Sequence, residues 1–346
     1  MKPILAITMG DPAGIGPEIV VKALSRKEIY DICIPVVIGD YYAINDAILF
    51  CGLDISINEI TEVKEAGGKH KKIDLINLKL LKNKAWEYKK VSDLCGKASF
   101  EYIRRGIDMA MSSTVHGVIT GPICKESINK AGFLYNGHTE IFAEFTKTNA
   151  YAMLLMSGSL RTIHVTTHVP LRKACELITK ERVYATIKLA VDAMTTLGIS
   201  NPRIAVAGLN PHAGENNMFG DEEINAIKPA VDKAAAEGIN VEGPLPPDTV
   251  FVKALNGLYD IVVAMYHDQG HIPVKLCGFK LTADRSSASL VSGINSTVGL
   301  PIIRVSVDHG TAFDIAGEGL ADDGSLVDAI KTGVLMAKAK FKDFRA

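Results

Sequence analysis

The chain has 346 residues, of which 47% are hydrophobic and 22% are charged, and its formal net charge at pH 7 is -1. This composition is typical of a globular protein with a substantial core, and it excludes disorder as the main state. With 38 Lys and Arg residues against 39 Asp and Glu residues, the chain lacks the basic excess that neutralises a nucleic-acid backbone. A small anionic ligand is still allowed, and the length predicts two domains of about 100–200 residues each.

The sequence also predicts the cellular compartment. The N-terminal stretch MKPILAITMGDPAGIG is interrupted by Gly and Pro too early for a secretory signal, and no run of about 18 apolar residues indicates a membrane span. The six cysteines are scattered and form no CxxC pair, so we expect neither a disulfide framework nor a zinc ribbon. These features favour a cytoplasmic protein without a membrane partner.

Short apolar runs recur along the chain, and each is ended by Gly, Asp, Pro or His and followed by a helical pattern. Continuous apolar strands that alternate with helices predict an α/β fold with a mainly parallel sheet covered on both faces. Ligands of such folds bind beyond the C-terminal ends of the strands. The predicted strands lie within residues 4–9, 34–39, 117–122, 151–157, 161–168, 203–211, 260–267 and 301–309.

The segment GDPAGIGPEI at residues 10–19 joins the first predicted strand to a helical pattern. Gly14 and Gly16 allow a tight turn and a close approach of the backbone to a ligand, and Pro17 suits the first turn of a helix. The N-terminus of that helix could hold an anion or a carboxamide group. The pattern is neither GxGxxG nor a Walker loop, so a plain strand–turn–helix junction explains it equally well.

Histidines supply the candidate metal ligands. The pairs His164/His168 and His267/His271 have the spacing of four residues that one metal ion needs on a helix. The first pair lies in a β-branched segment, where the side chains would be about 13 Å apart, and Gly and Pro make a helix at the second doubtful. One histidine from each of three strand ends, His168, His212 and His267, makes a better metal site with open positions for substrate oxygens. The alternative is that these histidines are structural, because any α/β protein can carry them there.

The segment VDHGTAFDIAGEG at residues 307–319 combines a strand end, a turn of small residues and an acidic residue, as nucleoside-binding loops do. Asp314 could accept hydrogen bonds from ribose hydroxyls, or it could cap a helix over the residues that follow. Lys125, Lys275 and Arg304 lie in or beside strand ends and suit a carboxylate or a phosphate. Arg304 needs a partner within its apolar strand, which is either a substrate or a structural carboxylate.

Taken in order, the motifs resemble the 4-hydroxythreonine-4-phosphate dehydrogenase (PdxA) family over nearly the whole chain. The opening GDPAGIGPE and the closing HGTAFDIAG also resemble segments of isopropylmalate and isocitrate dehydrogenases. The segments that carry the family resemblance are TGPICKESINKAGFLYNGHTEIFAE (120–144), TTHVPLR (166–172), GLNPHAGENNMFGDEE (208–223), GPLPPDTVF (243–251), YHDQGHIPVK (266–275) and GLPIIRVSVDHGTA (299–312).

The resemblance implies an isocitrate/isopropylmalate dehydrogenase-like fold, with two α/β/α domains and an active-site cleft between them. Residues 1–135 and 285–346 would form a discontinuous cofactor-side domain, and residues 136–284 a domain for metal and substrate binding and for dimerisation. The resemblance also implies a homodimer whose active sites include residues of both subunits. The stretch 280–294 is longer than the family pattern.

The resemblance further implies roles for individual residues. Asp248 and Asp268 are candidate general bases, or alternatively partners that fix a histidine tautomer. The cofactors would be NAD and a divalent metal (Zn, Mg, Mn or Co). The metal would be bound by His168, His212 and His267, the substrate by His138, Thr139, Lys275, Asn295 and Arg304, and NAD by Gly14, Gly16, Gly310 and Asp314.

The implied activity is NAD-dependent and metal-dependent oxidative decarboxylation of a short 4-phosphorylated hydroxy acid. The strings NGHTEIF and HDQGHIP resemble the family branch that acts on D-threonate or D-erythronate 4-phosphate in sugar-acid catabolism. The alternative within the family is 4-hydroxythreonine-4-phosphate dehydrogenase of pyridoxal 5'-phosphate biosynthesis. A phosphate acetyltransferase-like acyltransferase would use neither the three histidines nor the HGTAFDIAG loop. Intact histidines also disfavour a catalytically silent sensor on an enzyme fold.

Overall fold

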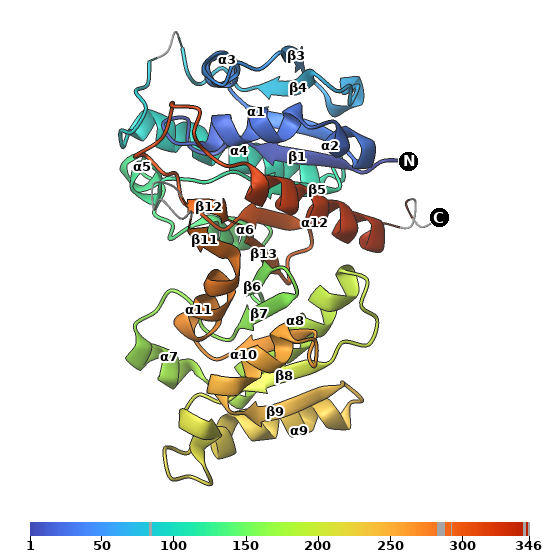
Figure 1. The fold of residues 1–346 in the computed structure, drawn as a ribbon, viewed down its shortest axis with the longest axis vertical. Coiled ribbons are helices and arrows are strands. Elements are labelled where there is room, and N and C mark those ends of the chain that lie inside the picture. Colours follow the sequence, from blue (N-terminus) through green and yellow to red (C-terminus); the bar gives the residue numbers. More distant parts are fainter. Residues whose placement is uncertain (83–84, 282–287, 292, 342–343, 345–346) are drawn as a thin grey trace. The chain divides into compact units, whose positions relative to one another are not determined.

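The computed structural model describes residues 1–82, 85–281, 288–291, 293–341 and 344. The chain divides into two compact units, and we call residues 1–148 and 300–346 unit 1 and residues 149–299 unit 2. Each unit has strands and helices of its own, and most strands pair in parallel, which confirms the predicted α/β class (Figure 1). Within the described residues, no helix is both long enough and apolar enough to cross a membrane.

The sheet of unit 1 is entirely parallel over the described strands. Its central strands are short apolar runs, as predicted, whereas two outer strands contain charged residues and were not predicted. In sheet order the strands are β3 (Ser56–Ile60), β4 (Lys72–Asn77), β2 (Ile34–Gly39), β1 (Ile4–Thr8), β5 (Gly117–Thr120) and β14 (Arg304–Val307).

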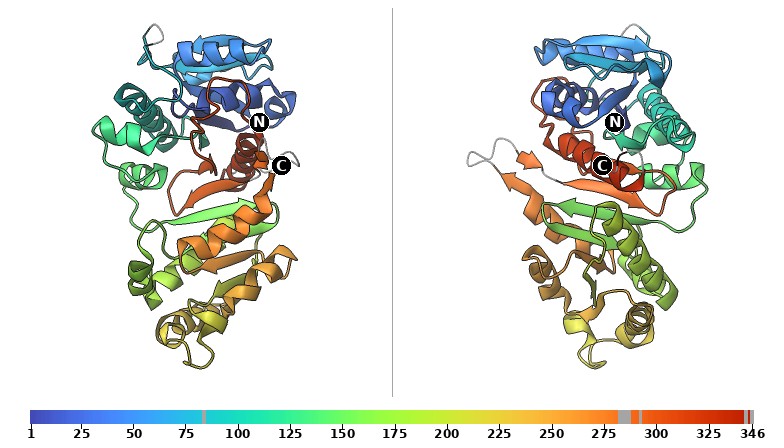
Figure 2. Two further views of the ribbon diagram at one scale, coloured as in Figure 1. Left: turned by 60° about the vertical axis from the view of Figure 1, so that its left-hand side comes forward. Right: turned by 90° about the vertical axis from the view of Figure 1, so that its right-hand side faces the viewer.

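Helices cover both faces of this sheet (Figure 2). They are α1 (Gly16–Ser25), α2 (Lys27–Ile32), α3 (Tyr41–Phe50), η1 (Val63–Glu65), α4 (Asp93–Met111), α5 (Lys125–Lys130), α6 (His138–Phe145) and α12 (Gly324–Lys340). Gly106 of α4 lies against Val118, and Gly333 of α12 lies against Ile119. Consecutive strand residues point to opposite faces of a sheet, so α4 and α12 cover opposite faces.

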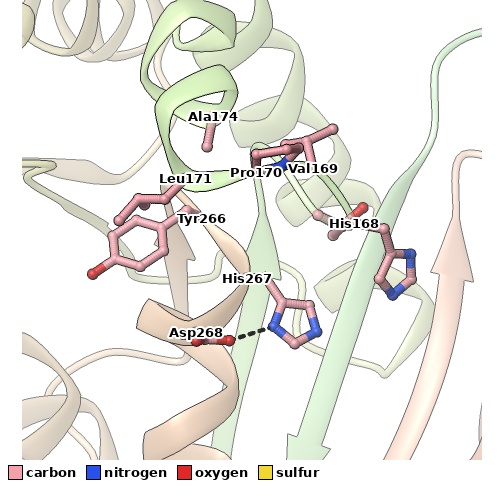
Figure 3. A pocket seen from close by; sticks show the side chains of 9 residues that line it. His168, Val169, Pro170, Leu171, Ala174, Tyr266, His267 and Asp268 are labelled. Atoms are coloured by element: carbon pink, nitrogen blue, oxygen red, sulfur yellow. Dashed lines mark hydrogen bonds and ion pairs between the residues drawn. The ribbon is translucent and has the colours of Figure 1, made fainter.

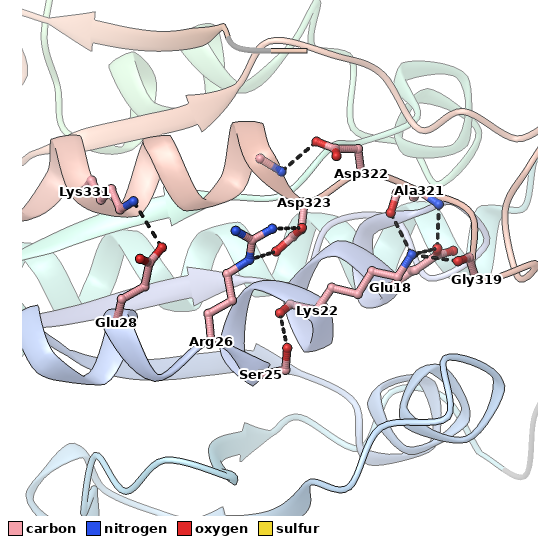
Figure 4. Close-up of polar contacts among 11 residues, drawn as sticks. Glu18, Lys22, Ser25, Arg26, Glu28, Gly319, Ala321, Asp322, Asp323 and Lys331 are labelled. Carbon is pink, nitrogen blue, oxygen red and sulfur yellow. Dashed lines mark hydrogen bonds and ion pairs between the residues drawn. The ribbon is translucent and has the colours of Figure 1, made fainter. Parts of the chain in front are cut away.

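Polar contacts join the first helix of unit 1 to its C-terminal segment (Figure 4). The buried carboxylate of Glu18 accepts a hydrogen bond from the backbone N–H of Ala321 at 2.6 Å and pairs with Nζ of Lys22 at 2.8 Å. Lys22 also donates to two carbonyl oxygens of the C-terminal segment, each at 2.7 Å. A bidentate pair of Arg26 with Asp323 adds a second connection. These contacts hold together parts of unit 1 that are far apart in the sequence.

Unit 2 has a mixed sheet. In sheet order its strands are β13 (Ile294–Val298), β6 (Ala152–Ser157), β7 (Leu160–His164), β10 (Ile261–Ala264), β8 (Ile204–Ala207) and β9 (Val241–Leu245). The first three strands alternate in direction, and the strands from β7 to β9 run parallel. A separate antiparallel pair, β11 (Phe279–Leu281) and β12 (Ala288–Val291), covers most of the described part of the stretch 280–294, of which residues 282–287 and 292 fall outside the described residues.

The core of unit 2 lies between its sheet and two helices. Phe251 and Val274 of these helices pack with Val262 and Ala264 of the central strand in one buried apolar cluster. The helices are α10 (Pro247–Leu255) and α11 (His267–Gly278), and α8 (Lys180–Thr196) and α9 (Lys228–Ala236) lie on the other side of the sheet (Figure 2). The other helical segments of unit 2 are α7 (Leu171–Leu177), η2 (Pro211–Gly214) and η3 (Glu223–Ile227).

The unit boundaries differ from the expected domain boundaries at 135/136 and 284/285. Helix α6 packs on α4 and belongs to unit 1, which brings His138 and Thr139 into that unit. Strand β13 pairs with β6 and belongs to unit 2, which brings Asn295 into that unit. All three were expected on the opposite sides of the division. Long-range packing and strand pairing place these segments, and neither is visible in local composition.

We predict that Lys22→Met lowers the free energy of unfolding by about 2–3 kcal/mol, because it leaves the buried Glu18 carboxylate and two carbonyl oxygens without their charged donor. Urea denaturation measures this loss. The matched control is Lys27→Met, whose exposed pair with Asp31 should contribute less than about 1 kcal/mol. Equal losses in the two variants would contradict a structural role for the Lys22 network.

Candidate active site

Two predicted histidines meet where β7 and β10 end. Helix α11 begins with His267, whose Nδ1 donates a hydrogen bond to Oδ1 of Asp268 at 2.7 Å, so its Nε2 is left as an acceptor. His168 lies in the loop after β7, with its ring centroid 5.6 Å from that of His267 (Figure 3). The cavity beside them has a volume of about 370 Å³ and is lined by Thr167, His168, Val169, Pro170, Leu171, Ala174, Tyr266, His267 and Asp268.

This pair has the donor chemistry of two metal ligands. Imidazoles that bind one ion at about 2.0–2.1 Å have ring centroids about 5 Å apart, close to the 5.6 Å between His168 and His267. The N–H of the second ring nitrogen of a histidine ligand usually donates a hydrogen bond to a carboxylate or a carbonyl, as Nδ1 of His267 does to Asp268. The two side chains therefore fit part of a metal site.

His212 is not joined to this pair. It lies in η2 after β8, with Nδ1 4.0 Å from Oδ1 of Asp248, and both side chains are more than half exposed. Among the described residues, no group of three or more His, Cys, Asp or Glu side chains is placed to hold a metal ion. Strand β8 is the neighbour of β10, so His212 follows the adjacent strand end. The three-histidine metal site stays a prediction of which the structure assembles two members.

A glutamine that the sequence analysis did not single out joins these strand ends. The side chain of Gln269 accepts a hydrogen bond from the backbone N–H of Met265 at 2.6 Å and donates one to the carbonyl of Gly208 at 2.7 Å. It thereby connects the turn before α11 with the end of β8. Its position inside the string HDQG, next to two candidate residues, was the only signal in the sequence.

A buried glutamate organises the loop that carries His212. One carboxylate oxygen of Glu223 accepts hydrogen bonds from the backbone N–H groups of Leu209 and Asn210 at 2.7 and 2.8 Å. His212 and Ala213 adopt left-handed backbone angles, with φ of 52° and 57°. Such angles are unfavourable for residues with a Cβ and concentrate at functional loops. The acidic string GDEE contained Glu223, but its burial could not be predicted from that string.

The second histidine pair lies on a helix, so the doubt about its helical spacing was wrong. Helix α11 runs through Pro273, since packing of the helix in the core outweighs the local cost of proline. The rings of His267 and His271 are stacked, with centroids 3.6 Å apart and an interplanar angle of 11°. Burial lowers the pKa of His271 to about 3 and that of His164 to about 4, so both rings are neutral at neutral pH.

The remaining predicted substrate ligands of unit 2 lie on two different elements. Lys275 is half-buried on α11, eight residues after His267, and therefore shares a helix face with it. Asn295 lies on β13 opposite Leu155, and its Oδ1 is buried without a hydrogen-bond partner among the described residues. An acceptor left in this state suits a polar ligand.

The predicted substrate arginine of unit 1 is buried at the start of β14. Arg304 is 2% exposed, and its Nη2 donates to Oγ1 of Thr120 at 3.1 Å. Burial lowers its pKa to about 9, and the negative charge of Glu140 opposes this shift. The structure is therefore consistent with both expected types of partner, a structural carboxylate and a substrate. Glu140 is a nearby carboxylate, and one carboxylate does not use all five guanidinium donors.

His138 lies close to two positive charges. Burial holds its pKa well below the usual value, and the charges of Arg304 and Lys125 lower it further. Its Nε2 is buried and has no hydrogen-bond partner among the described residues. Thr139 follows it at the N-terminus of α6, where backbone N–H groups are directed outward. Cations, imidazole and helix N-terminus together suit an anionic group.

The two glycine-containing loops of unit 1 contact each other. The backbone N–H of Ile15 donates to the carbonyl of Thr311 at 3.0 Å, and a Cβ on Gly14 would lie 2.8 Å from Cβ of Thr311. A Cβ on Gly16 would overlap the carbonyl oxygen of Met9, whereas the space around Gly310 is open. Packing within the loops therefore accounts for Gly14 and Gly16, and a role of these residues in cofactor binding stays a prediction.

Asp314 is exposed in the second of these loops. Residues 313–319 form turns, so the alternative that Asp314 caps a helix is wrong. The turns contain two glycines with positive φ, Gly317 at 80° and Gly319 at 73°, which are incompatible with a continuous helix. The exposed carboxylate remains available to a ligand.

The buried carboxyl of Asp11, in the segment formed by residues 10–19, should make the stability of the protein depend on pH. It is fully buried, and burial raises its pKa from 3.8 to about 6, against the opposing hydrogen bond from the backbone N–H of Ala13. The raised pKa means that the folded state favours the protonated carboxyl. The contribution of the protonated Asp11 carboxyl to the free energy of unfolding is therefore complete below pH 3.8 and is lost as the pH rises to about 6. We expect a loss on the order of 3 kcal/mol across this range that is absent in Asp11→Asn.

Urea denaturation between pH 4 and 7 tests this expectation. Asp192→Asn, at an exposed helix position, is the control and should retain the pH profile of the unchanged protein. A profile of Asp11→Asn parallel to that of the unchanged protein would refute the assignment.

Comparison with known proteins is consistent with these features. The family model described as "Pyridoxal phosphate biosynthetic protein PdxA" matches residues 31–333. A protein of Oceanobacillus iheyensis named "Putative D-threonate 4-phosphate dehydrogenase" is 47% identical over 341 residues, which are 98% of this chain and 99% of that protein. A solved 4-hydroxythreonine-4-phosphate dehydrogenase from Klebsiella pneumoniae is 41% identical, with a TM-score of 0.85 over 97% of this chain and 100% of that chain.

A more distant solved structure is a terephthalate 1,2-cis-dihydrodioldehydrogenase from Burkholderia xenovorans. It is 30% identical, with a TM-score of 0.66 over 97% of this chain and 98% of that chain. The resemblance inferred from the motifs is confirmed by the family match and by the extent of these alignments. The chain belongs to the PdxA family.

Proposed function

We propose that this protein is a dehydrogenase that oxidises and decarboxylates D-threonate or D-erythronate 4-phosphate, with NAD and a divalent metal ion as cofactors. The observation that carries the proposal is the pair His168 and His267, with Asp268 on the second ring nitrogen of His267. The name of the Oceanobacillus relative supports the D-threonate 4-phosphate substrate. Its alignment extends over almost the entire length of both chains.

The polar groups of unit 1 would receive an anionic group of the substrate. Arg304 is buried and fixed by Thr120, so it can offer guanidinium donors without reorganising. Nε2 of His138, for which the described residues supply no hydrogen-bond partner, and the N-terminus of α6 lie in the same part of the unit. Lys125, whose charge acts on His138, adds a cation that the family resemblance did not assign to the substrate.

His168 and His267 would hold the metal, with His212 as the third ligand. When bound, the metal ion would act as a Lewis acid toward substrate oxygens. His267 has the tautomer that this role needs, because the hydrogen bond of its Nδ1 to Asp268 leaves the lone pair of Nε2 free. Lys275, on the same helix face, would contact the substrate beside this pair.

The two aspartates have different suitability for general-base catalysis. Asp268 is engaged by His267 at 2.7 Å, so we assign it to orienting that ring. Asp248 lies 4.0 Å from His212 with its side chain 57% exposed, which leaves its oxygens able to accept a proton from a bound hydroxyl. Bound NAD would supply the hydride acceptor for the carbon that carries this hydroxyl, and the oxidised product, a β-keto acid, would lose its carboxylate as CO2.

A substrate panel tests the proposal. We expect NADH and an equal amount of CO2 from D-threonate or D-erythronate 4-phosphate, loss of the reaction after chelation, and its return with added Mn²⁺ or Co²⁺. His168→Ala should lower kcat/KM by about 100-fold or more, since it removes a metal ligand. His70→Ala, at an exposed histidine of unit 1, should not change it.

The panel includes 4-hydroxythreonine 4-phosphate, because the solved relative from Klebsiella carries that name. Preference for this amino acid would reject the sugar-acid substrate and favour the pyridoxal phosphate branch. Failure of all three compounds with every metal would reject the proposed substrate class.

We also propose a homodimer in which both subunits contribute to each active site. Mixing two inactive variants tests this: His168→Ala affects the metal pair of unit 2, and Arg304→Lys affects the anion group of unit 1. After denaturation and joint refolding, the mixture should regain activity that neither variant shows alone. A mixture as inactive as its components would show that each site draws both groups from one subunit.

A further inference from the structure

The hydrogen bond to Asp268 does not by itself hold the His267 ring in one orientation. It fixes one edge of the ring at Nδ1, and the ring plane can still turn about that contact. Asp268 is itself a weak anchor, since its side chain is 70% exposed. A second contact must hold the plane of the ring if Nε2 is to point in a constant direction.

His271 makes that second contact. Its ring lies flat against that of His267, with centroids 3.6 Å apart and an interplanar angle of 11°. Its Nδ1 donates to the carbonyl of His267 at 2.9 Å, which ties the two residues together across one helical turn. His271 is only 7% exposed, so it has little freedom to swing away.

His164 closes the space behind His271. It is fully buried at the end of β7, its Nδ1 donates to the carbonyl of Met153 at 3.1 Å, and its ring centroid is 4.6 Å from that of His271. A Cβ added to Gly270 would overlap its Nε2. The absence of a side chain at position 270 therefore leaves room for the His164 ring next to α11.

We propose that His271, supported by His164, is a positioning residue that holds the ring plane of His267. Neither histidine belongs to the predicted three-histidine metal site, and the contacts described above commit their Nδ1 atoms to backbone carbonyls. A flat ring suits this place, because one of its faces covers the His267 ring at an interplanar angle of 11° while the His164 ring, tilted by 44°, packs against it. The inference rests on the proposed function in one respect, the use of His267 as a metal ligand.

Titration of the intact protein with Co²⁺ alone tests the inference, read by calorimetry and by the visible absorption of bound Co²⁺. His271→Ala should bind Co²⁺ about 10-fold to 100-fold more weakly and with an altered spectrum, the range found when a residue that orients a ligand is removed. His271→Phe keeps a flat ring and should retain most of the affinity and the spectrum. His70→Ala is the control for loss of an imidazole elsewhere.

A second set of variants tests the support from His164. Gly270→Ala should weaken Co²⁺ binding because the added methyl group displaces the His164 ring. The double variant with His164→Ala should bind little or no more weakly than His164→Ala alone, since the overlap with the His164 ring is then gone and only the 3.1 Å approach to Cβ of Ala264 remains. This non-additive result separates a specific contact from general destabilisation.

The outcomes are distinguishable. Unchanged affinity and spectrum in His271→Ala would overturn the positioning role while the proposed function stands. Equal losses in His271→Ala and His271→Phe would also overturn it, because the flat ring would then be irrelevant. Failure of the unchanged protein to bind Co²⁺ would overturn the inference and the proposed metal site together.

Discussion

The side-chain amide of Gln269 connects two neighbouring strand ends of unit 2, and the geometry of the candidate active site depends on it. It accepts from Met265 in the turn before α11 and donates to Gly208 at the end of β8. Parallel strands bring their carboxyl ends to one edge of a sheet, where backbone groups lose their ladder partners. An amide has both a donor and an acceptor, so one side chain satisfies two such groups. His267 and the loop of His212 follow the ends that it connects.

Burial of polar groups is a recurrent feature of both units. In unit 1, Arg304 and His138 are held where water solvates them poorly, which lowers the pKa of each. In unit 2, Asn295 keeps a buried acceptor that no described residue satisfies. Such groups cost stability in the free protein, and a ligand that completes their hydrogen bonds offsets that cost. The same physical condition thus marks the places where we propose that the substrate binds.

The local pattern of the chain predicted some elements and not others. The strands at 34–39 and 117–122 are continuous apolar runs, and β2 and β5 lie within them. β3 and β9 were not predicted, because SINEI is largely polar and VEGPL contains Gly and Pro, as edge strands tolerate. The pattern also suggested that α11 would be interrupted, although its burial in the core sustains it through Pro273.

The sequence by itself determined the α/β class, the family and the chemical types of the candidate site residues, because these depend on local periodicity and on short ordered motifs. Only the tertiary structure decided which residues meet. It stacked His271 on His267, placed Asp268 on the other nitrogen, and brought Glu140 near Arg304. It also assigned α6 to unit 1 and β13 to unit 2. These outcomes depend on helix packing and strand pairing between segments far apart in the chain, and the residue pattern of a single segment predicts neither.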